Sequence, residues 1–135
     1  MKRNRGVTFT LLILAAFLLL AGCATMESFV SVYAKHYRWI PYVPTEPASV
    51  EILRSEPMHP NVRLGEIVLE PQGAPPVVEM EQKLKEAAAE MGANAAVIVA
   101  DATMRMGSIN VGPQWKREID PFGRETIAVA IRYVQ

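Results

Sequence analysis

The sequence predicts an α+β fold, a small ββαββ domain in which one helix packs on a four-stranded sheet. Four short segments rich in β-branched and apolar residues lie between prolines, glycines or loops, as strands do. Between the second and third of them, apolar residues recur at helical spacing. Beyond residue 22 the chain holds four Leu but thirteen Val and eight Ile, a composition that favours strands. A chain of 135 residues suits one small domain, which we place at residues 49–135.

The first 22 residues have the layout of a secretory signal peptide that is cleaved off. Lys2, Arg3 and Arg5 precede an uninterrupted apolar run over residues 11–21. This run is shorter than the ~20 residues that cross the hydrocarbon core of a bilayer. An uncleaved signal anchor is the alternative, because the stretch from Val7 to Ala24 is longer.

The end of this run, Leu20-Ala21-Gly22-Cys23, resembles the lipobox of bacterial lipoproteins. The resemblance implies cleavage between Gly22 and Cys23, a diacylglycerol on the Cys23 thiol and an acyl chain such as palmitate on the new amine. Several chains, each adding roughly 0.8 kcal/mol per buried methylene, would anchor the protein stably to a lipid bilayer. Ala24 resembles the sorting pattern for the outer membrane of Gram-negative cells, so we expect the periplasmic side of that membrane. Cys23 is the only cysteine, which excludes an internal disulfide and a cysteine-based zinc site.

Residues 23–48 are expected to form the lipidated N-terminus and a proline-containing tether. Within residues 26–40, apolar and aromatic side chains recur at steps of three and four, beside a basic edge. This segment could lie along the lipid headgroups, pack on the domain or remain extended, and the sequence does not decide between them. Pro41, Pro44 and Pro47 exclude a helix through residues 41–47.

The domain is expected to contain one helix between two pairs of strands. The strands are predicted at residues 49–54, 62–70, 94–102 and 126–134, and the helix at 77–91. Pro76 suits the first turn of that helix, and Gly92 suits the left-handed residue that stops it. On its wet face, Glu79 with Lys83 and Glu81 with Lys85 have the four-residue spacing of favourable ion pairs.

The last two strands are apolar on both sides of the pleat, so both faces of the sheet need cover. The helix covers one face, and alanines on the last strand, opposite Ala87 and Ala88, would permit a close approach. The second face must be covered by residues 26–47, by the loop 103–123 or by another chain. We therefore expect a protein partner or a homo-oligomer that forms through the open sheet face.

A second resemblance concerns the domain. LGEI at 64–67, LKEAAAEMGANAAVIVA at 84–100 and the apolar last strand resemble the small domain of the RcsF and YbjQ families, over about residues 50–134. The most specific part is Gly92-Ala93-Asn94-Ala95. RcsF-like proteins are outer-membrane lipoproteins that sense envelope damage and are held by disulfides, whereas this chain has no cysteine after Cys23. YbjQ-like domains are associated with oligomers and a metal role.

The residues give little sign of catalytic chemistry, so we expect no enzyme, no cofactor and no metal. The part beyond residue 22 has eleven basic and fourteen acidic side chains, which argues against binding to nucleic acid. His36 and His59 lie far apart, and soft-metal capture by Met58, Met104 and Met106 is the minor alternative to methionine as core filler. Asp101, among apolar neighbours, is the one acid to examine, although a strand-end residue that reaches solvent is the simpler interpretation.

The loop 103–123 is long for so small a domain, and long loops are often functional. Trp115 and Phe122 are candidate contacts for a partner, because exposed aromatic side chains anchor many interfaces. The alternative is that Trp115 folds back over the open sheet face. The preferred function is thus a non-enzymatic interaction, assembly or stress-sensing module, and a lipoprotein that binds a small ligand or a metal is the alternative.

Overall fold

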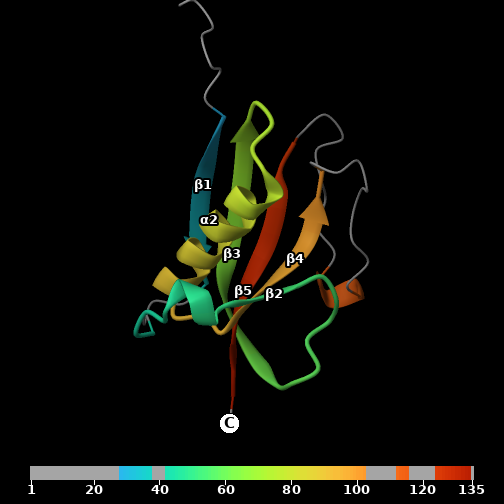
Figure 1. The fold of residues 1–135 in the computed structure, drawn as a ribbon. Coiled ribbons are helices and arrows are strands. Elements are labelled where there is room, and N and C mark those ends of the chain that lie inside the picture. The colour runs from blue at the N-terminus through green and yellow to red at the C-terminus, as the bar shows by residue number, and fades with distance from the viewer. Residues whose placement is uncertain (1–27, 38–41, 103–111, 116–123, 135) are drawn as a thin grey trace, which may run out of the picture.

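In the described part of the computed structural model, one α-helix packs on a five-stranded mixed sheet. Figure 1 shows how these elements are arranged. The structure describes residues 28–37, 42–102, 112–115 and 124–134. The elements in chain order are β1 (Phe29–His36), the 3-10 turn η1 (Pro47–Ser49), β2 (Glu51–Leu53), β3 (Asn61–Gln72), α2 (Val77–Glu90), β4 (Ala95–Asp101), η2 (Pro113–Trp115) and β5 (Thr126–Tyr133). The strand order is β1-β3-β5-β4-β2, in which β2 and β4 are parallel and all other neighbours are antiparallel. The α+β class is confirmed, but the expectation of four strands is wrong.

The additional strand, β1, lies within the segment that was expected as a tether or an amphipathic helix. It pairs with β3 from Phe29 opposite Gln72 to His36 opposite Gly65, and it forms one edge of the sheet. The spacing of Phe29, Tyr33 and Tyr37 explains the ambiguity, because a step of four residues returns to the same face of a strand as well as of a helix. The β-branched Val30 and Val32 favour the strand.

Helix α2 begins at Val77 as its sequence predicts and ends at Glu90, one residue before the predicted end. Pro76 occupies the N-cap position, and Gly92 follows the helix with a φ of 78°, in the left-handed region. On the wet face the ion pairs differ from the expected ones, since Glu81 contacts Arg54 and Lys83 contacts Glu86 at 3.4 Å. Both are exposed pairs, which solvent screens, so they contribute little to stability.

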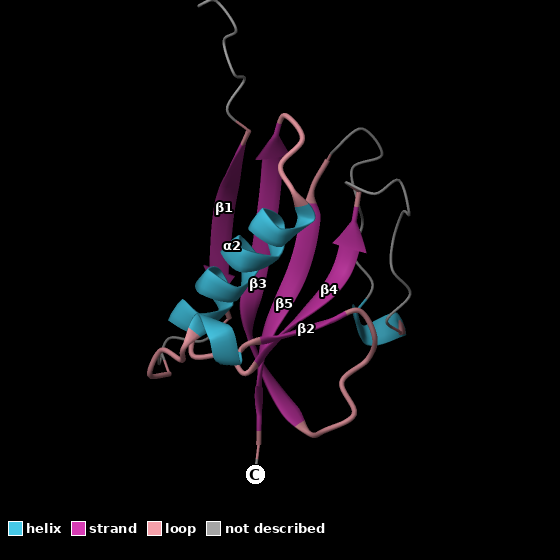
Figure 2. Cartoon of the chain, viewed as in Figure 1, coloured by secondary structure: helices cyan, strands magenta, loops and turns pink. Residues whose placement is uncertain are grey.

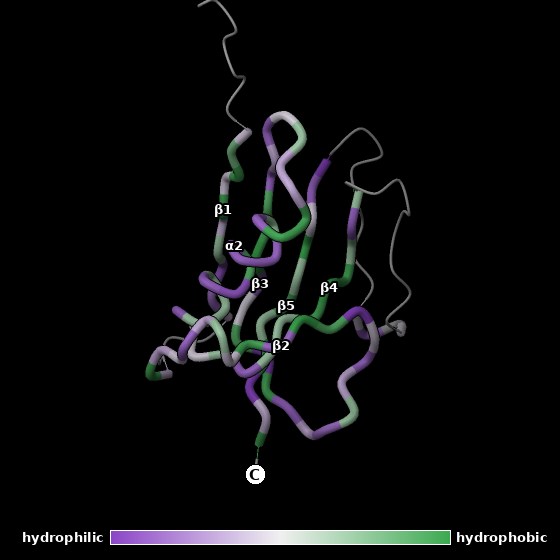
Figure 3. The backbone as a smooth tube through the Cα atoms, in the orientation of Figure 1, coloured by the Kyte–Doolittle hydropathy of each residue, from purple (hydrophilic) through white to green (hydrophobic). Residues whose placement is uncertain are grey.

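The face of the sheet under α2 holds the larger core cluster. Leu84, Ala87 and Ala88 of the helix pack in one cluster with Ala128 and Ala130 of β5. The expected close approach of the helix to small alanines is therefore confirmed. Figure 3 shows that β4 is largely hydrophobic, whereas α2 carries many hydrophilic residues on its outer side.

The opposite face holds a second cluster, built on β4 and β5. Val97, Val99, Val129 and Ile131 are all fully buried there. Trp115, from η2, packs against these side chains and is 3% exposed. Part of the 103–123 loop thus covers this half of the second face, which was one of the three expected sources of cover. Within the described residues, no helix is long and apolar enough to cross a membrane.

Candidate functional site

A cavity of about 440 Å³ lies between the first half of α2 and the sheet beneath it. Its apolar walls come from Leu69 of β3, Met80 and Leu84 of α2, and Ile98 of β4. The loop between β3 and α2 forms one rim through Gly73, Ala74 and Pro75. This volume lies within the range of about 300–1,000 Å³ that is usual for small-molecule sites.

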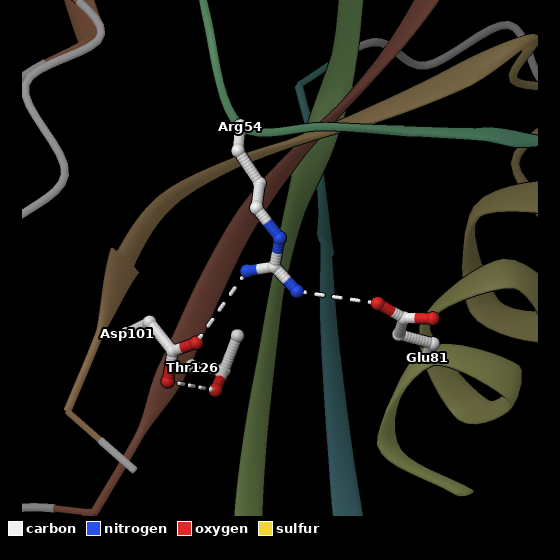
Figure 4. A network of polar contacts seen from close by, with 4 residues as sticks. All are labelled: Arg54, Glu81, Asp101 and Thr126. Carbon is white, nitrogen blue, oxygen red and sulfur yellow. Dashed lines mark hydrogen bonds and ion pairs between the residues drawn. The ribbon is translucent and has the colours of Figure 1, made fainter. Parts of the chain in front are cut away.

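Polar side chains from four elements meet in this cavity, as Figure 4 shows. Arg54, the residue after β2, donates a hydrogen bond from Nη2 to Glu81 Oε1 on α2 at 3.2 Å. Its other terminal nitrogen, Nη1, lies 3.7 Å from Asp101 Oδ2 at the end of β4. Thr126, the first residue of β5, donates from Oγ1 to Asp101 Oδ1 at 3.2 Å. One guanidinium therefore bridges the helix and the sheet across the cavity.

Asp101 is the buried member of this network. Its side chain is 8% exposed, whereas those of Arg54 and Glu81 are 44% and 40% exposed. The interpretation of Asp101 as a strand-end residue that reaches solvent is therefore wrong. A buried carboxylate loses hydration, so it requires a nearby cation and hydrogen-bond donors, which Arg54 and Thr126 supply. A partly desolvated charge network inside a cavity is a common feature of binding sites.

Arg124 adds a second guanidinium at the rim of the cavity. It precedes β5 by two residues and is exposed. Among the described residues, no carboxylate lies within ion-pair distance of Arg124. Arg124 can therefore accept an anion from solution, whereas the charge of Arg54 is already shared by two carboxylates.

Trp115 lies on the other side of the sheet and does not belong to this cavity. The guanidinium of Arg63 stacks over its ring, with Cζ 4.1 Å from the ring centroid. Arg63 also donates from Nη1 to the Gln114 carbonyl at 3.1 Å, which fixes the turn that carries the indole. Trp115 is therefore folded back over the sheet, which was the alternative to an exposed contact residue.

The other side chains selected from the sequence are not brought together. His36 lies on β1, whereas His59 contacts the Tyr133 ring edge-on, with centroids 5.8 Å apart. The described ranges contain no group of three or more His, Cys, Asp or Glu side chains that could hold a metal. Met58 is 94% exposed. Gly22, Cys23, Met104, Met106 and Phe122 lie outside the described residues.

A second exposed surface follows β1 on the face opposite α2. Residues paired across β1 and β3 share a face, and Tyr33 is opposite Val68, which packs in the cluster of the second face. Phe29 and Tyr33 therefore point away from α2, and they are 57% and 55% exposed. We call these two residues the β1 aromatic surface.

The comparisons with known proteins leave the family open. No family model matches this chain, and a search of curated proteins finds no significant match. Among solved structures, the chain is similar to the crystal structure of FvfA, a Francisella virulence factor. The similarity covers 77% of this chain and 98% of that chain, with 11% identity and a TM-score of 0.46. At this level the similarity carries no argument about function.

Proposed function

We propose that this protein is a lipoprotein of the bacterial envelope, anchored through acylated Cys23 on the periplasmic side of the outer membrane. It acts there as a non-enzymatic interaction, assembly or stress-sensing module. The main support for this proposal is the lipobox-like Leu20-Ala21-Gly22-Cys23, which ends a short apolar run that follows three basic residues. The resemblance of residues 50–134 to YbjQ-like domains, which are associated with oligomers, supports an assembly role, whereas the disulfide-dependent sensing of RcsF-like proteins is not carried over to a chain without cysteine after Cys23.

The interaction role is supported by the β1 aromatic surface. Phe29 and Tyr33 expose large rings on an edge strand, and the outer edge of such a strand can pair with another chain. Trp115 covers the β4 and β5 part of the same face, so a partner or a second copy would contact the part over β1.

The anchor is tested by metabolic labelling of the full-length protein with an alkyne analogue of palmitate. Wild type is expected to be labelled and to begin at Cys23, whereas Cys23→Ser is expected to accumulate as an unlabelled precursor. The matched control adds Ser55→Cys to Cys23→Ser, which restores one thiol at an exposed position away from the lipobox. Normal labelling of Cys23→Ser, or a wild-type protein that still begins at Met1, would refute the anchor.

The contact surface is tested in intact cells with a photo-crosslinking amino acid in place of Tyr33. We expect one defined adduct, either with a second copy or with a partner protein. The same amino acid in place of Met58, which is 94% exposed against 55% for Tyr33 and lies in the loop before β3, is the control. Identical adducts from both positions would show that contact at β1 is not specific.

The second candidate function, binding of a small ligand by the same lipoprotein, is favoured by one specific observation. The cavity under α2 combines apolar walls with a buried, hydrogen-bonded carboxylate and two guanidiniums. Small-molecule sites typically have such predominantly apolar walls and a few fixed polar groups.

A further inference from the structure

The cavity under α2 lies at the end of the domain where β1 begins. Phe29, the first residue of β1, pairs with Gln72 at the end of β3. The same end contains Asp101 and Thr126, which pair with each other, and the loop that leads into α2. Figure 2 shows that β1 begins at the end of the sheet where the loop from β3 leads into α2.

Covalent geometry keeps this end close to any anchor on Cys23. Five peptide bonds separate Cys23 from Ser28, so the two residues lie at most about 18 Å apart. Strand β3 contains twelve residues, so its far end at Asn61 lies roughly 35–40 Å from the end at Gln72. With Cys23 acylated, the cavity therefore lies at the membrane-proximal end of the domain.

The walls of the cavity match a hydrocarbon chain. Leu69, Leu84 and Ile98, which are 1–2% exposed, form the floor of the cavity, and the more accessible apolar lining comes from Val77 and Met80. Methionine adapts its shape to flexible apolar ligands, because its unbranched side chain has three rotatable bonds. Each methylene removed from water in such a site adds to the affinity, because burial of apolar surface is favourable.

The positive charge at the rim of the cavity favours a ligand with an anionic head group. Arg54 shares its charge with Glu81 and Asp101, so Arg124 is the cation lining the cavity that has no ion pair among the described residues. Val77, in the first turn of α2, also lines the cavity, and Pro76 provides no side-chain hydrogen bond to that turn. The positive end of the helix dipole therefore adds to the charge of Arg124.

From these observations we propose that the cavity binds an acyl chain with an anionic head group, a carboxylate or a phosphate, taken from the adjacent membrane. The chain lies between α2 and the sheet, and the head group contacts Arg124 at the rim. The site deepens the ligand-binding candidate above, and its membrane-facing orientation rests on the proposed anchor at Cys23.

The test is photo-crosslinking of the full-length protein in phosphatidylcholine nanodiscs, with probes that carry a diazirine in a hexadecanoyl chain. The probes are the free acid, a phosphatidylglycerol and the uncharged monoacylglycerol with the same chain. We expect the two anionic probes to label the segments at 69–84 and 98, with the uncharged probe clearly weaker. Labelling by the acid alone identifies a free fatty acid as the ligand, and labelling by phosphatidylglycerol alone identifies a phospholipid.

Three variants localise the labelling. Ala74→Trp places a large side chain on an exposed rim position and is expected to abolish labelling at 69–84 without removing any buried group. Arg124→Gln is expected to weaken binding of the anionic probes about two- to fivefold, as for one exposed ion pair, and to leave the uncharged probe unchanged. Lys35→Gln on β1 removes an exposed cation that does not line the cavity, so it is the matched control.

Labelling confined to other segments, or undiminished labelling in Ala74→Trp, would overturn the site. Equal labelling by charged and uncharged probes would overturn the head-group assignment. The same mass spectra report acylation of Cys23, so the two proposals fail separately. If Cys23 is acylated but the cavity is not labelled, only the proposed ligand site is refuted. If the cavity is labelled but Cys23 is not acylated, only the anchor and the orientation that depends on it are refuted.

Discussion

Trp115 is expected to stabilise the domain substantially, because it is the aromatic cover of the second sheet face. Burial of a Trp removes about 150–250 Å² from water, which at about 25 cal/mol per Å² contributes roughly 4–6 kcal/mol. Its indole Nε1 is buried without a hydrogen-bond partner in the described part of the structure, which costs about 1–3 kcal/mol. We therefore expect Trp115→Ala to lower the free energy of unfolding by about 2–4 kcal/mol.

The assay is urea unfolding followed by far-UV circular dichroism, since the substitution removes a fluorescent reporter. Trp115→Phe, which keeps an aromatic ring but lacks the N–H group, is expected to lower the free energy of unfolding less than Trp115→Ala does. Met58→Ala, at a side chain 94% exposed, is the control and is expected to change stability by less than about 0.5 kcal/mol. If Trp115→Ala matches this control while capture of a partner is lost, Trp115 is a contact residue and its packing role is refuted.

Three further predictions concern other parts of the domain. Gly92→Ala is expected to destabilise by more than about 1 kcal/mol in urea unfolding, because φ is 78° and the new Cβ would lie 2.6 Å from Tyr42 Cβ; an unchanged midpoint would contradict this. Asp101→Ala is expected to lower the free energy of unfolding by only about 1–2 kcal/mol, because Arg54 keeps its ion pair with Glu81 and stays partly hydrated. A loss above ~4 kcal/mol would show that the network is chiefly structural. Burial, together with the Glu51 carboxylate that accepts a hydrogen bond from the Tyr133 hydroxyl, raises the pKa of Tyr133 above its ordinary value. The protonated hydroxyl therefore contributes stability below pH ~10, and this contribution is lost as the pH rises through the pKa of the folded state. Stability of Tyr133→Phe should accordingly fall less steeply with alkaline pH than that of wild type, and identical slopes would contradict this.

Local signals in the chain were sufficient for α2 and for the central strands. The apolar stripe ending at Gly92 and the proline before it depend only on residues within a few positions of one another. The run that became β4 is apolar at nearly every position, which is typical of a strand covered on both faces. Such patterns can be recognised without knowledge of the partners.

Strand β1 could not be predicted in this way. Its aromatic spacing fits a helix and a strand equally, and the choice depends on pairing with residues 65–72, more than twenty-five positions away. The cover provided by Trp115 is similarly non-local, since the sequence allowed its side chain to face solvent or the sheet. Long-range pairing decides both cases.

The cavity shows the same division most clearly. The sequence by itself determined a helix, apolar strands and a lone acid, Asp101, at the end of one of them. Only the strand order β1-β3-β5-β4-β2 decided that Thr126 and Arg54, which also binds Glu81, contact that acid. The physical reason is that a buried carboxylate must find its cation and its donor in space, and residues that supply them are placed by the sheet and not by their separation along the chain.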